Sequence, residues 1–383
     1  MIEFVALIGV VIIASILTDA FEIVVLPRRV PRNFRLGRLY FMGTWRPWKA
    51  IAHQLRGKRR EYFLSIYGPL SVFGLLVVWA TGLIFGFALI DLAISWARPS
   101  PDGAHGLWMN LYLSGTTFFT LGPGDVVAHS MLGRVVMVLE SGTGFGFLAV
   151  VIGYLPVIYG AFARREVSIV LLDARSGSPP TAAELLRRHA GARGLDALEL
   201  LFHEWERWSA DLLESHISYP VVAYFRSQHD NQSWVAALTA ILDSTTIVVA
   251  GVDGACARQA KLTFAMARHA VVDLTQTFHA TPRMPAVDRL PPADLAQLRQ
   301  SLAEVGLNFH CDAACDIKIA ELRAMYEPYL NALSAHLFAP IPPWIHPHEV
   351  RENWRTSAWS RISKGTRSSA EDRAYDAADA HSD

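Results

Sequence analysis

The sequence predicts an all-α membrane protein with a separate soluble helical domain, and three observations carry this prediction. Hydrophobic residues make up 52% of the 383 residues, which is high for a wholly soluble protein, and the mean hydropathy is positive. Two apolar stretches, residues 63–97 and 131–162, exceed the roughly 20 helical residues that cross a membrane. The second half of the chain instead mixes apolar residues at helical spacing with charges.

The N-terminal stretch, residues 1–26, is predicted to be an additional transmembrane helix. Its uninterrupted apolar part, residues 4–17, covers only about 21 Å as a helix. It spans the membrane if Asp19 and Glu22 lie at the interface, near Arg28 and Arg29. The alternative is an interfacial or re-entrant helix. A signal peptide is not indicated, because no basic residue precedes the apolar stretch.

Residues 27–62 form a basic segment that predicts the membrane orientation. Residues 28–60 contain eleven Lys or Arg and no Asp or Glu. Because basic loops stay in the cytoplasm, this segment and everything after residue 163 are predicted to be cytoplasmic, and residues 98–130 face outside. Aromatic residues such as Trp45 and Trp48 among the basic ones favour a helix that lies on an anionic leaflet; the alternative is a charged linker. The chain is thus expected to be a multi-pass cell-membrane protein. Its net charge of zero gives no reason to expect a nucleic-acid partner.

The stretch TTFFTLGPGD, residues 116–125, lies in the outward-facing segment between the two long apolar runs. Irregular backbone at membrane depth is tolerated only where it is buried in protein or lines a watery path. Gly122 and Gly124 can adopt positive φ, and their alternation with bulkier residues can turn successive carbonyls to one side. A ring of such carbonyls replaces the water shell of a cation.

This stretch resembles the filter of the potassium channel superfamily, which reads Thr, aliphatic, Gly, aromatic or Leu, Gly, Asp. The resemblance covers residues 63–165, the predicted pore domain with its outer helix, pore helix and inner helix. It implies a homotetramer that passes K⁺ as the permeant ion, with no cofactor and no enzymatic activity. The predicted ion-binding filter residues are Thr120, Leu121, Gly122, Pro123 and Gly124. The predicted supports of the filter are Thr117, Asp125 and Glu140.

Pro123 departs from the family pattern. Proline keeps the carbonyl oxygen that a filter uses but lacks the aromatic ring that helps to hold the filter open in the family. Potassium conduction is therefore expected, whereas strong selectivity over sodium is left open.

The predicted inner helix, residues 131–163, contains residues at which helices bend or pack closely. The candidate gate hinge comprises Gly142, Gly146, Gly153 and Pro156, and pure helix packing is the alternative. Glu140 is expected to face the rear of the filter or the vestibule, because an ionisable group facing lipid is costly. A structural hydrogen bond and proton sensing are both open roles for it.

Residues 166–362 predict a cytoplasmic helical domain, and residues 363–383 predict a disordered polar tail. Thr181 and Glu184 form a capping-box pair at the start of a helix. Further helices are expected over residues 293–306 and 312–338. No G-x-G-x-x-G turn of a nucleotide-binding domain is present in the sequence.

Metal binding is only weakly indicated in this domain. The candidate groups are Glu199, His203 and Glu206 at helical spacing, and His310, Cys311 and Cys315. The alternatives are a solvated helix face for the first group and buried small residues for the second. Disulfides are not expected for three cysteines in a cytoplasmic domain.

The sequence as a whole predicts a tetrameric, potassium-selective cation channel that its C-terminal domain regulates. The alternatives are a non-selective cation channel, or a non-conducting membrane sensor whose helical domain binds a partner or metal.

Overall fold

The computed structural model of this protein describes residues 2–24, 36–97, 106–122, 130–190, 194–228, 231–252, 254–285, 287–307 and 313–346. The regular secondary structure of these residues is helical, with no strand among them, so the predicted all-α class is confirmed. The chain forms two compact units. Unit 1 comprises Met1–Arg164 and Glu214–Arg226, and unit 2 comprises Arg165–Leu213 and Ser227–Asp383. The predicted tail, residues 363–383, lies outside the described residues.

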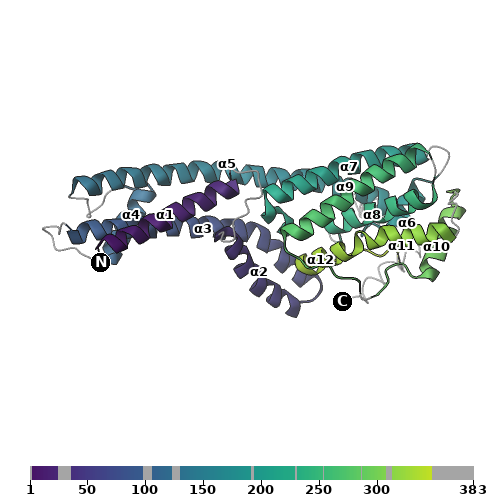
Figure 1. Ribbon diagram of the computed structural model, residues 1–383, viewed down its shortest axis with the longest axis horizontal. Helices are drawn as coiled ribbons and strands as arrows, with labels where there is room; N and C mark the ends of the chain where they lie inside the picture. Colours follow the sequence, from purple (N-terminus) through teal and green to yellow (C-terminus); the bar gives the residue numbers. More distant parts are fainter. Residues whose placement is uncertain are drawn as a thin grey trace, which may run out of the picture. The chain divides into compact units, whose positions relative to one another are not determined.

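Unit 1 contains three stretches that are helical, long and apolar enough to cross a membrane. They are α1 (Ile2–Val24), most of α3 (Gly57–Ala97) and the first part of α5 (Met131–Ser176). Two further α-helices, α2 (Leu36–Gln54) and α4 (Leu107–Phe118), and the 3-10 helix η1 (Pro220–Tyr224) complete the unit. Figure 1 shows the order of these helices along the chain.

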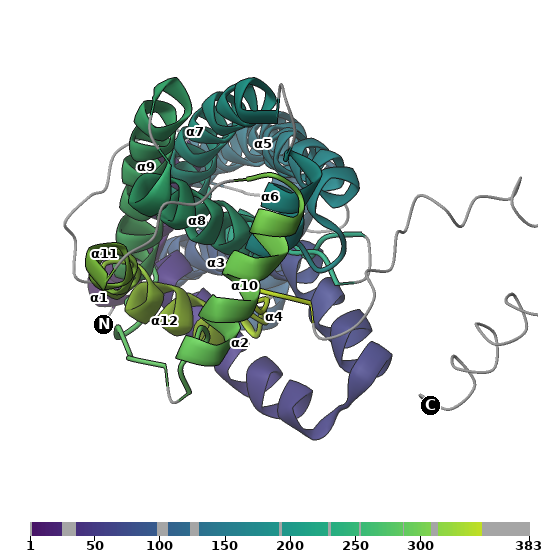
Figure 2. The same cartoon turned by 90° about the vertical axis from the view of Figure 1, so that its right-hand side faces the viewer.

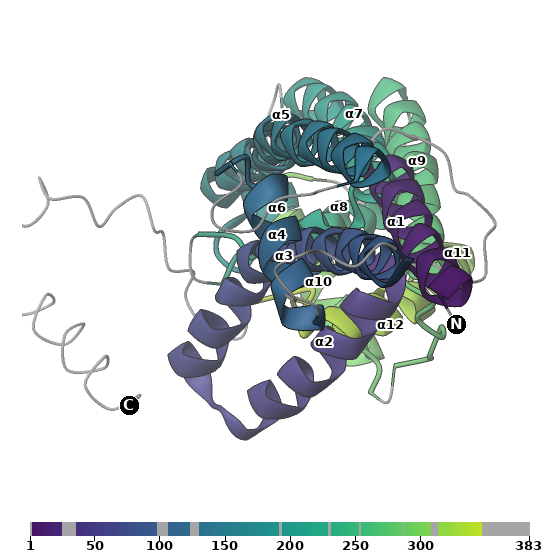
Figure 3. The same ribbon diagram turned by 90° about the vertical axis from the view of Figure 1, so that its left-hand side faces the viewer.

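Helix α1 packs along α3 (Figure 3), and glycines of both helices lie at the contact. A methyl group at Gly9 would lie 2.5 Å from the carbonyl oxygen of Gly86, and one at Gly82 would lie 2.4 Å from Ile16 Cδ1. The absence of side chains at these glycines therefore lets the two backbones approach closely. Gly82 and Gly86 are four residues apart, which is the spacing of close helix pairs in membranes. The apolar N-terminal stretch is thus a 23-residue helix packed on a second apolar helix.

Asp19 is a buried acid near the end of α1. Its two carboxylate oxygens accept hydrogen bonds from the backbone N–H of Gly37, at 3.2 and 3.1 Å, and one oxygen also accepts from Trp79 Nε1 at 3.0 Å. Gly37 is in the first turn of α2, where backbone N–H groups have no helical partner and a carboxylate is favourable. Asp19 therefore joins three helices; its predicted neighbours Arg28 and Arg29 lie outside the described residues.

The tryptophans of helix α2 pack against aromatic residues of α3. Trp48 stacks on Phe63 with ring centroids 4.2 Å apart, and Trp45, which is buried, lies 4.7 Å from Tyr67. The opposite face of α2 exposes apolar and basic side chains, namely Arg38, Leu39, Met42, Arg46 and Ile51. The aromatic residues that suggested a lipid-facing helix thus face α3, while a mixed basic and apolar face stays exposed.

Unit 2 is a helical bundle built around α8 (Trp234–Gly251). The other helices of the unit are the end of α5 (residues 165–176), α6 (Ala182–Arg188), α7 (Gly194–Ser218, up to residue 213), α9 (Ala255–Thr277), α10 (Pro292–Glu304), α11 (Ala313–Ala324) and α12 (Glu327–Leu337). Helix α8 is also long and apolar enough to cross a membrane, but most of it is covered by neighbouring helices of the unit (Figure 2). Protein therefore takes the place that lipid would take around a transmembrane helix.

Two predictions for unit 2 need correction in detail. Thr181 caps α6 by accepting a hydrogen bond from the Glu184 N–H, as predicted, but the Glu184 side chain binds Arg187 and Arg188 instead of closing the capping box. Burial opposes ionisation of Glu184, yet the two arginines hold its pKa below the usual value. The helix predicted over residues 312–338 is two helices, because Pro328 in the first turn of α12 cannot continue a preceding helix.

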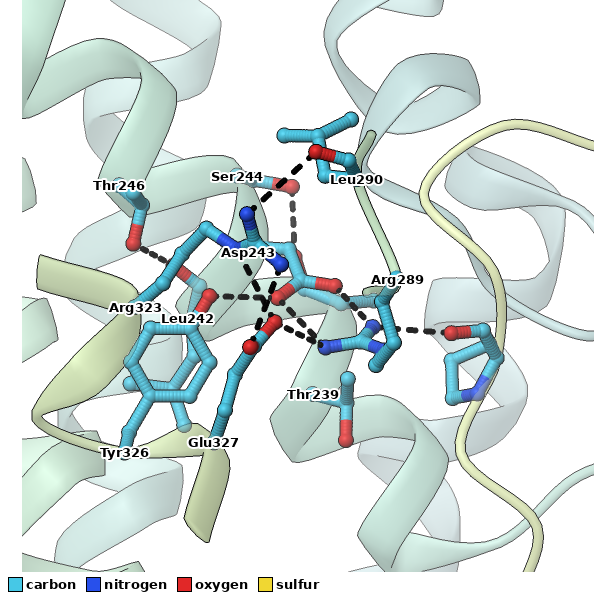
Figure 4. Close-up of polar contacts among 12 residues, drawn as sticks. Thr239, Leu242, Asp243, Ser244, Thr246, Arg289, Leu290, Arg323, Tyr326 and Glu327 are labelled. Carbon is cyan, nitrogen blue, oxygen red and sulfur yellow. Dashed lines mark hydrogen bonds and ion pairs between the residues drawn. The ribbon is translucent and has the colours of Figure 1, made fainter. Parts of the chain in front are cut away.

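A buried ion network at α8 ties distant segments of unit 2 together (Figure 4). Asp243 on α8 accepts from Arg289 Nη2 and from the Tyr326 hydroxyl, each at 2.6 Å. Arg289 also donates to Glu327 Oε1 at 3.1 Å and to the Pro342 carbonyl at 2.9 Å. Burial alone would lower the pKa of Arg289, but attraction to Asp243, Tyr326 and Glu327 outweighs it and raises the pKa, so the guanidinium stays charged.

We expect the substitution Arg289→Met to destabilise unit 2 by about 3 to 5 kcal/mol, because it leaves the buried Asp243 carboxylate without its charged partner. The substitution Lys318→Met removes an exposed ion pair with Glu321 and should cost less than about 1 kcal/mol. Chemical denaturation of the full-length protein in detergent, followed by tryptophan fluorescence, measures both. Equal losses in the two variants would contradict a structural role for the network.

Candidate functional site

Helix α4 (Leu107–Phe118) is a short apolar helix in the segment between α3 and α5. Its 12 residues rise about 18 Å, too little to cross a membrane about 30 Å thick. It is fixed to α3 by the Ser114 hydroxyl, which lies 2.8 Å from the carbonyl oxygen of Ile84. Helix α4 is therefore packed against α3 within unit 1, and residues 119–122 begin from this packed helix end.

The backbone after α4 leaves the helix with alternating signs of φ. Thr120 has φ of +56° and Gly122 has φ of +92°, whereas Leu121 between them does not have a positive φ. The Thr120 and Leu121 N–H groups are still held by α4, through the carbonyls of Thr117 at 3.0 Å and Thr116 at 2.9 Å. Positive φ is uncommon for a β-branched residue, and such strain concentrates at functional sites.

Positive φ at Gly122 agrees with the expectation from the sequence, while that at Thr120 was not predicted. Pro123, Gly124 and Asp125 lie outside the described residues, so the roles assigned to them stay predictions. The same holds for the ion-binding role of the whole TLGPG stretch.

Glu140 of α5 is fully buried and meets α4 at Ser114. The Ser114 hydroxyl is hydrogen bonded to Glu140 Oε1 and to the Ile84 carbonyl. One hydroxyl has one proton, so it cannot donate to both oxygens at once. If Glu140 is protonated at Oε1, it can donate to the Ser114 oxygen while the Ser114 hydroxyl donates to the Ile84 carbonyl. Within the described chain, Glu140 Oε2 and the Thr117 hydroxyl are buried without a hydrogen-bond partner.

Gly144, one turn beyond Glu140, allows α4 to rest on α5. A methyl group at Gly144 would lie 1.9 Å from the carbonyl oxygen of Phe118, the last residue of α4. The Phe118 ring is buried and lies 5.7 Å from the ring of Phe147 on α5. Two contacts one turn apart on α5, Glu140 and Gly144, thus position the end of the short helix. Sequence reasoning missed Ser114 as the partner of Glu140 and did not separate Gly144 from the neighbouring glycines.

The residues of the predicted gate hinge lie on one uninterrupted helix, α5. A methyl group at Gly142, Gly146 or Gly153 would meet no atom within 4 Å, so these glycines, unlike Gly144, are not required for packing within the described part of one chain. Pro156 lies inside α5 and cannot donate the helical hydrogen bond to the residue four positions earlier. Bending at these positions stays a prediction.

The described residues contain no group of His, Cys, Asp or Glu that could hold a metal ion. Cys315 is disulfide-bonded, so the expectation that no disulfide forms is wrong, and its sulfur has no thiolate for a metal. His310 and Cys311 lie outside the described residues. Cys256 is a buried free thiol, and burial raises its pKa to about 11, which makes it unreactive.

Comparison with known proteins agrees with this geometry. Residues 74–158, which contain most of α3, all of α4 and the first part of α5, match the model of a family described as ion channel. The chain is a membrane protein with an ion-channel domain. It is also 23% identical, over 244 residues, to the uncharacterized membrane protein YdjJ of Bacillus subtilis strain 168. That alignment covers 62% of this chain and 69% of YdjJ. No solved structure matches.

We expect Gly144→Ala to destabilise the ion-channel domain by about 1 to 3 kcal/mol, because the new methyl group overlaps a backbone oxygen that cannot rotate away. The matched control is Gly142→Ala, which adds the same methyl group to the same helix in open space and should be neutral or stabilising by about 0.5 to 1 kcal/mol. Thermal unfolding of both purified variants in detergent measures the difference. A lower midpoint for Gly142→Ala than for Gly144→Ala would refute this assignment.

Proposed function

We propose that this protein is a homotetrameric cation channel that conducts K⁺ through backbone carbonyls of residues 120–124. The observation that carries the proposal is the alternation of φ at Thr120, Leu121 and Gly122 directly after a short helix between two apolar helices. A backbone of alternating handedness can aim successive carbonyl oxygens at one line of ions. Such oxygens replace the ion's hydration water, so the ion crosses without a covalent step and without a cofactor.

Four copies follow from the single pore stretch in each chain. The carbonyl groups of one chain coordinate an ion from one side only. A complete ring of carbonyls therefore needs several copies of the chain around a rotational symmetry axis. In this arrangement α5 lines the path and α3 faces lipid. Exposed apolar residues occur along both helices of the single chain, for example Phe73 and Val77 on α3 and Phe145 and Ile152 on α5, which gives surface for both lipid and neighbouring copies.

The orientation of the proposed channel follows from its basic residues. The basic segment before α3 and Arg164 and Arg165 after the transmembrane part of α5 belong in the cytoplasm, so unit 2 is cytoplasmic and residues 98–130 face outside. The exposed face of α2, with Arg38 and Arg46 beside Leu39 and Met42, suits contact with an anionic leaflet. Unit 2 regulates the opening of the pore.

A non-selective cation channel is the second candidate, and Pro123 is the observation that favours it. The filter of the potassium channel superfamily has an aromatic residue or Leu at this position, and proline has neither a large ring nor an N–H with which to brace the filter. The two candidates share the pore and differ only in how well it rejects Na⁺.

The two candidates are separated by the reversal potential of the purified protein in planar bilayers, with K⁺ on one side and Na⁺ on the other. A selective filter gives a value near the K⁺ equilibrium potential, because only K⁺ carries current. A clear current that reverses near zero supports the non-selective channel. No current from pH 5 to 8, with correctly assembled protein, would contradict both candidates and favour a non-conducting sensor.

We expect Gly122→Ala to lower K⁺ flux into liposomes at least tenfold, because alanine is strained at φ of +92° and would turn the carbonyls away from the path. Gly115→Ala is the matched control: it lies in α4, and its added methyl group meets no atom within 4 Å. This variant should keep normal flux. Normal flux through Gly122→Ala would show that the Gly122 backbone is not part of the ion path.

A further inference from the structure

A segment from the second half of the sequence is built into unit 1. Residues 219–226, Tyr-Pro-Val-Val-Ala-Tyr-Phe-Arg, include η1 and follow α7, and we call them the wedge. Val221, Val222 and Phe225 of the wedge are at most 4% exposed. They belong to the same apolar cluster as Trp79 of α3 and Ile158 of α5. The wedge is therefore part of the core of the ion-channel unit rather than a surface loop.

Phe225 lies between α3 and α5. On the α5 side its ring centroid is 5.7 Å from that of Tyr159 and 5.6 Å from that of Phe162. On the α3 side it covers Gly68, where a methyl group would lie 2.8 Å from Phe225 Cδ2. One side chain thus fills the space between the two helices, and the missing side chain at Gly68 makes room for it.

Other residues of the wedge fix its two ends. Tyr219 lies 6.0 Å from Tyr154 of α5, between ring centroids. Tyr224 packs edge-on against Trp45 of α2, at 4.8 Å, and against Tyr67 of α3, at 5.4 Å. Arg226 lies 3.7 Å from the carboxylate of Glu61, at the start of α3. The wedge therefore contacts α2, α3 and α5.

The wedge contacts α5 on both sides of Pro156, where the helix lacks one backbone hydrogen bond. Its contacts on α5 run from Tyr154 to Phe162 and so lie on both sides of Pro156. Because Pro156 cannot donate a helical hydrogen bond to the carbonyl of Ile152, the direction that α5 takes beyond this point depends more on packing than elsewhere in the helix. The chain enters the wedge from α7, which begins in unit 2, and returns to unit 2 at Ser227. A change in unit 2 can therefore act on α5 through the covalent chain.

We propose that Phe225 is a positioning residue for conduction that holds α5 away from α3 and so keeps the inner end of the ion path narrow. This inference rests on the proposed function, in which α5 lines the path and α3 lies behind it. Filling the space between the helices keeps α5 toward the axis, and emptying that space lets α5 move back toward α3. The wedge is then the element through which unit 2 regulates the pore.

Single-channel recording of full-length Phe225→Ala in planar bilayers tests the proposal. The expected result is an open probability at least tenfold above that of the unsubstituted protein, with an unchanged reversal potential, because the filter is not altered. An unchanged or lower open probability would overturn the proposal. If the unsubstituted protein carries no cation current at all, the proposed function fails instead, so the two failures are distinguishable.

The matched control is Phe264→Ala, which removes a buried phenyl ring that packs on Tyr326 within unit 2. This variant loses a similar apolar contact but leaves the wedge intact, so its open probability should stay within twofold of the unsubstituted protein. A rise equal to that of Phe225→Ala would show that loss of stability, and not loss of the wedge, opens the pore.

Amide hydrogen exchange tests the role of the wedge without ion current, so it also applies to a variant that does not conduct. Amide hydrogen exchange of residues 154–162, followed by mass spectrometry of the full chain in detergent, should be at least tenfold faster in Phe225→Ala. It should be unchanged in Phe264→Ala. Unchanged exchange in Phe225→Ala would contradict the role of the wedge in holding α5.

Discussion

The contact between the Phe118 carbonyl and Gly144 is the constraint on which the ion-channel domain depends. A short helix between two helices that can cross a membrane leaves irregular backbone behind it, and at membrane depth such backbone is tolerated only where protein or a watery path surrounds it. Here the end of α4 rests directly on the backbone of α5, at a position where any side chain would collide with it. The Ser114 hydroxyl and the Glu140 carboxyl add a polar contact one turn away. The backbone with positive φ at Thr120 and Gly122 starts from this support, so the contact with α5 helps to place the start of the candidate filter.

Three of the buried acids, Asp19, Glu140 and Asp243, illustrate one rule in different parts of the protein. Asp19 is matched by the Gly37 N–H at the start of α2, Glu140 by the Ser114 hydroxyl, and Asp243 by the Arg289 guanidinium. In each case the acid joins separate segments of the chain, because a buried charge or carboxyl group without partners is costly. These acids therefore help to specify which segments meet.

The two units are connected by more than one crossing of the chain, because residues 214–226 of unit 1 lie between two segments of unit 2. Residues 214–226 return to unit 1 after α7 begins in unit 2, and the wedge at the end of this stretch packs between α3 and α5. A domain attached only at the end of α5 could act on that helix only by pulling or twisting it. The inserted segment instead contacts the sides of three helices of unit 1, which gives a second mechanical route to the same helix.

The sequence by itself determined the all-α class, the positions of the apolar helices and the short helix before TLGPGD, because hydrophobic length and helical periodicity are local properties. It also indicated that Gly122 has a special backbone and that Thr181 caps a helix. Only the tertiary structure decided what the buried polar residues bind, which of the four glycines from 142 to 153 packs against α4, and that the tryptophans of α2 face protein. The placement of residues 219–226 beside α5 could not be predicted either, because a local sequence pattern does not show which helices an apolar segment packs between. Contacts between residues far apart in the chain are set by the shapes of both partners, and only the folded chain brings those shapes together.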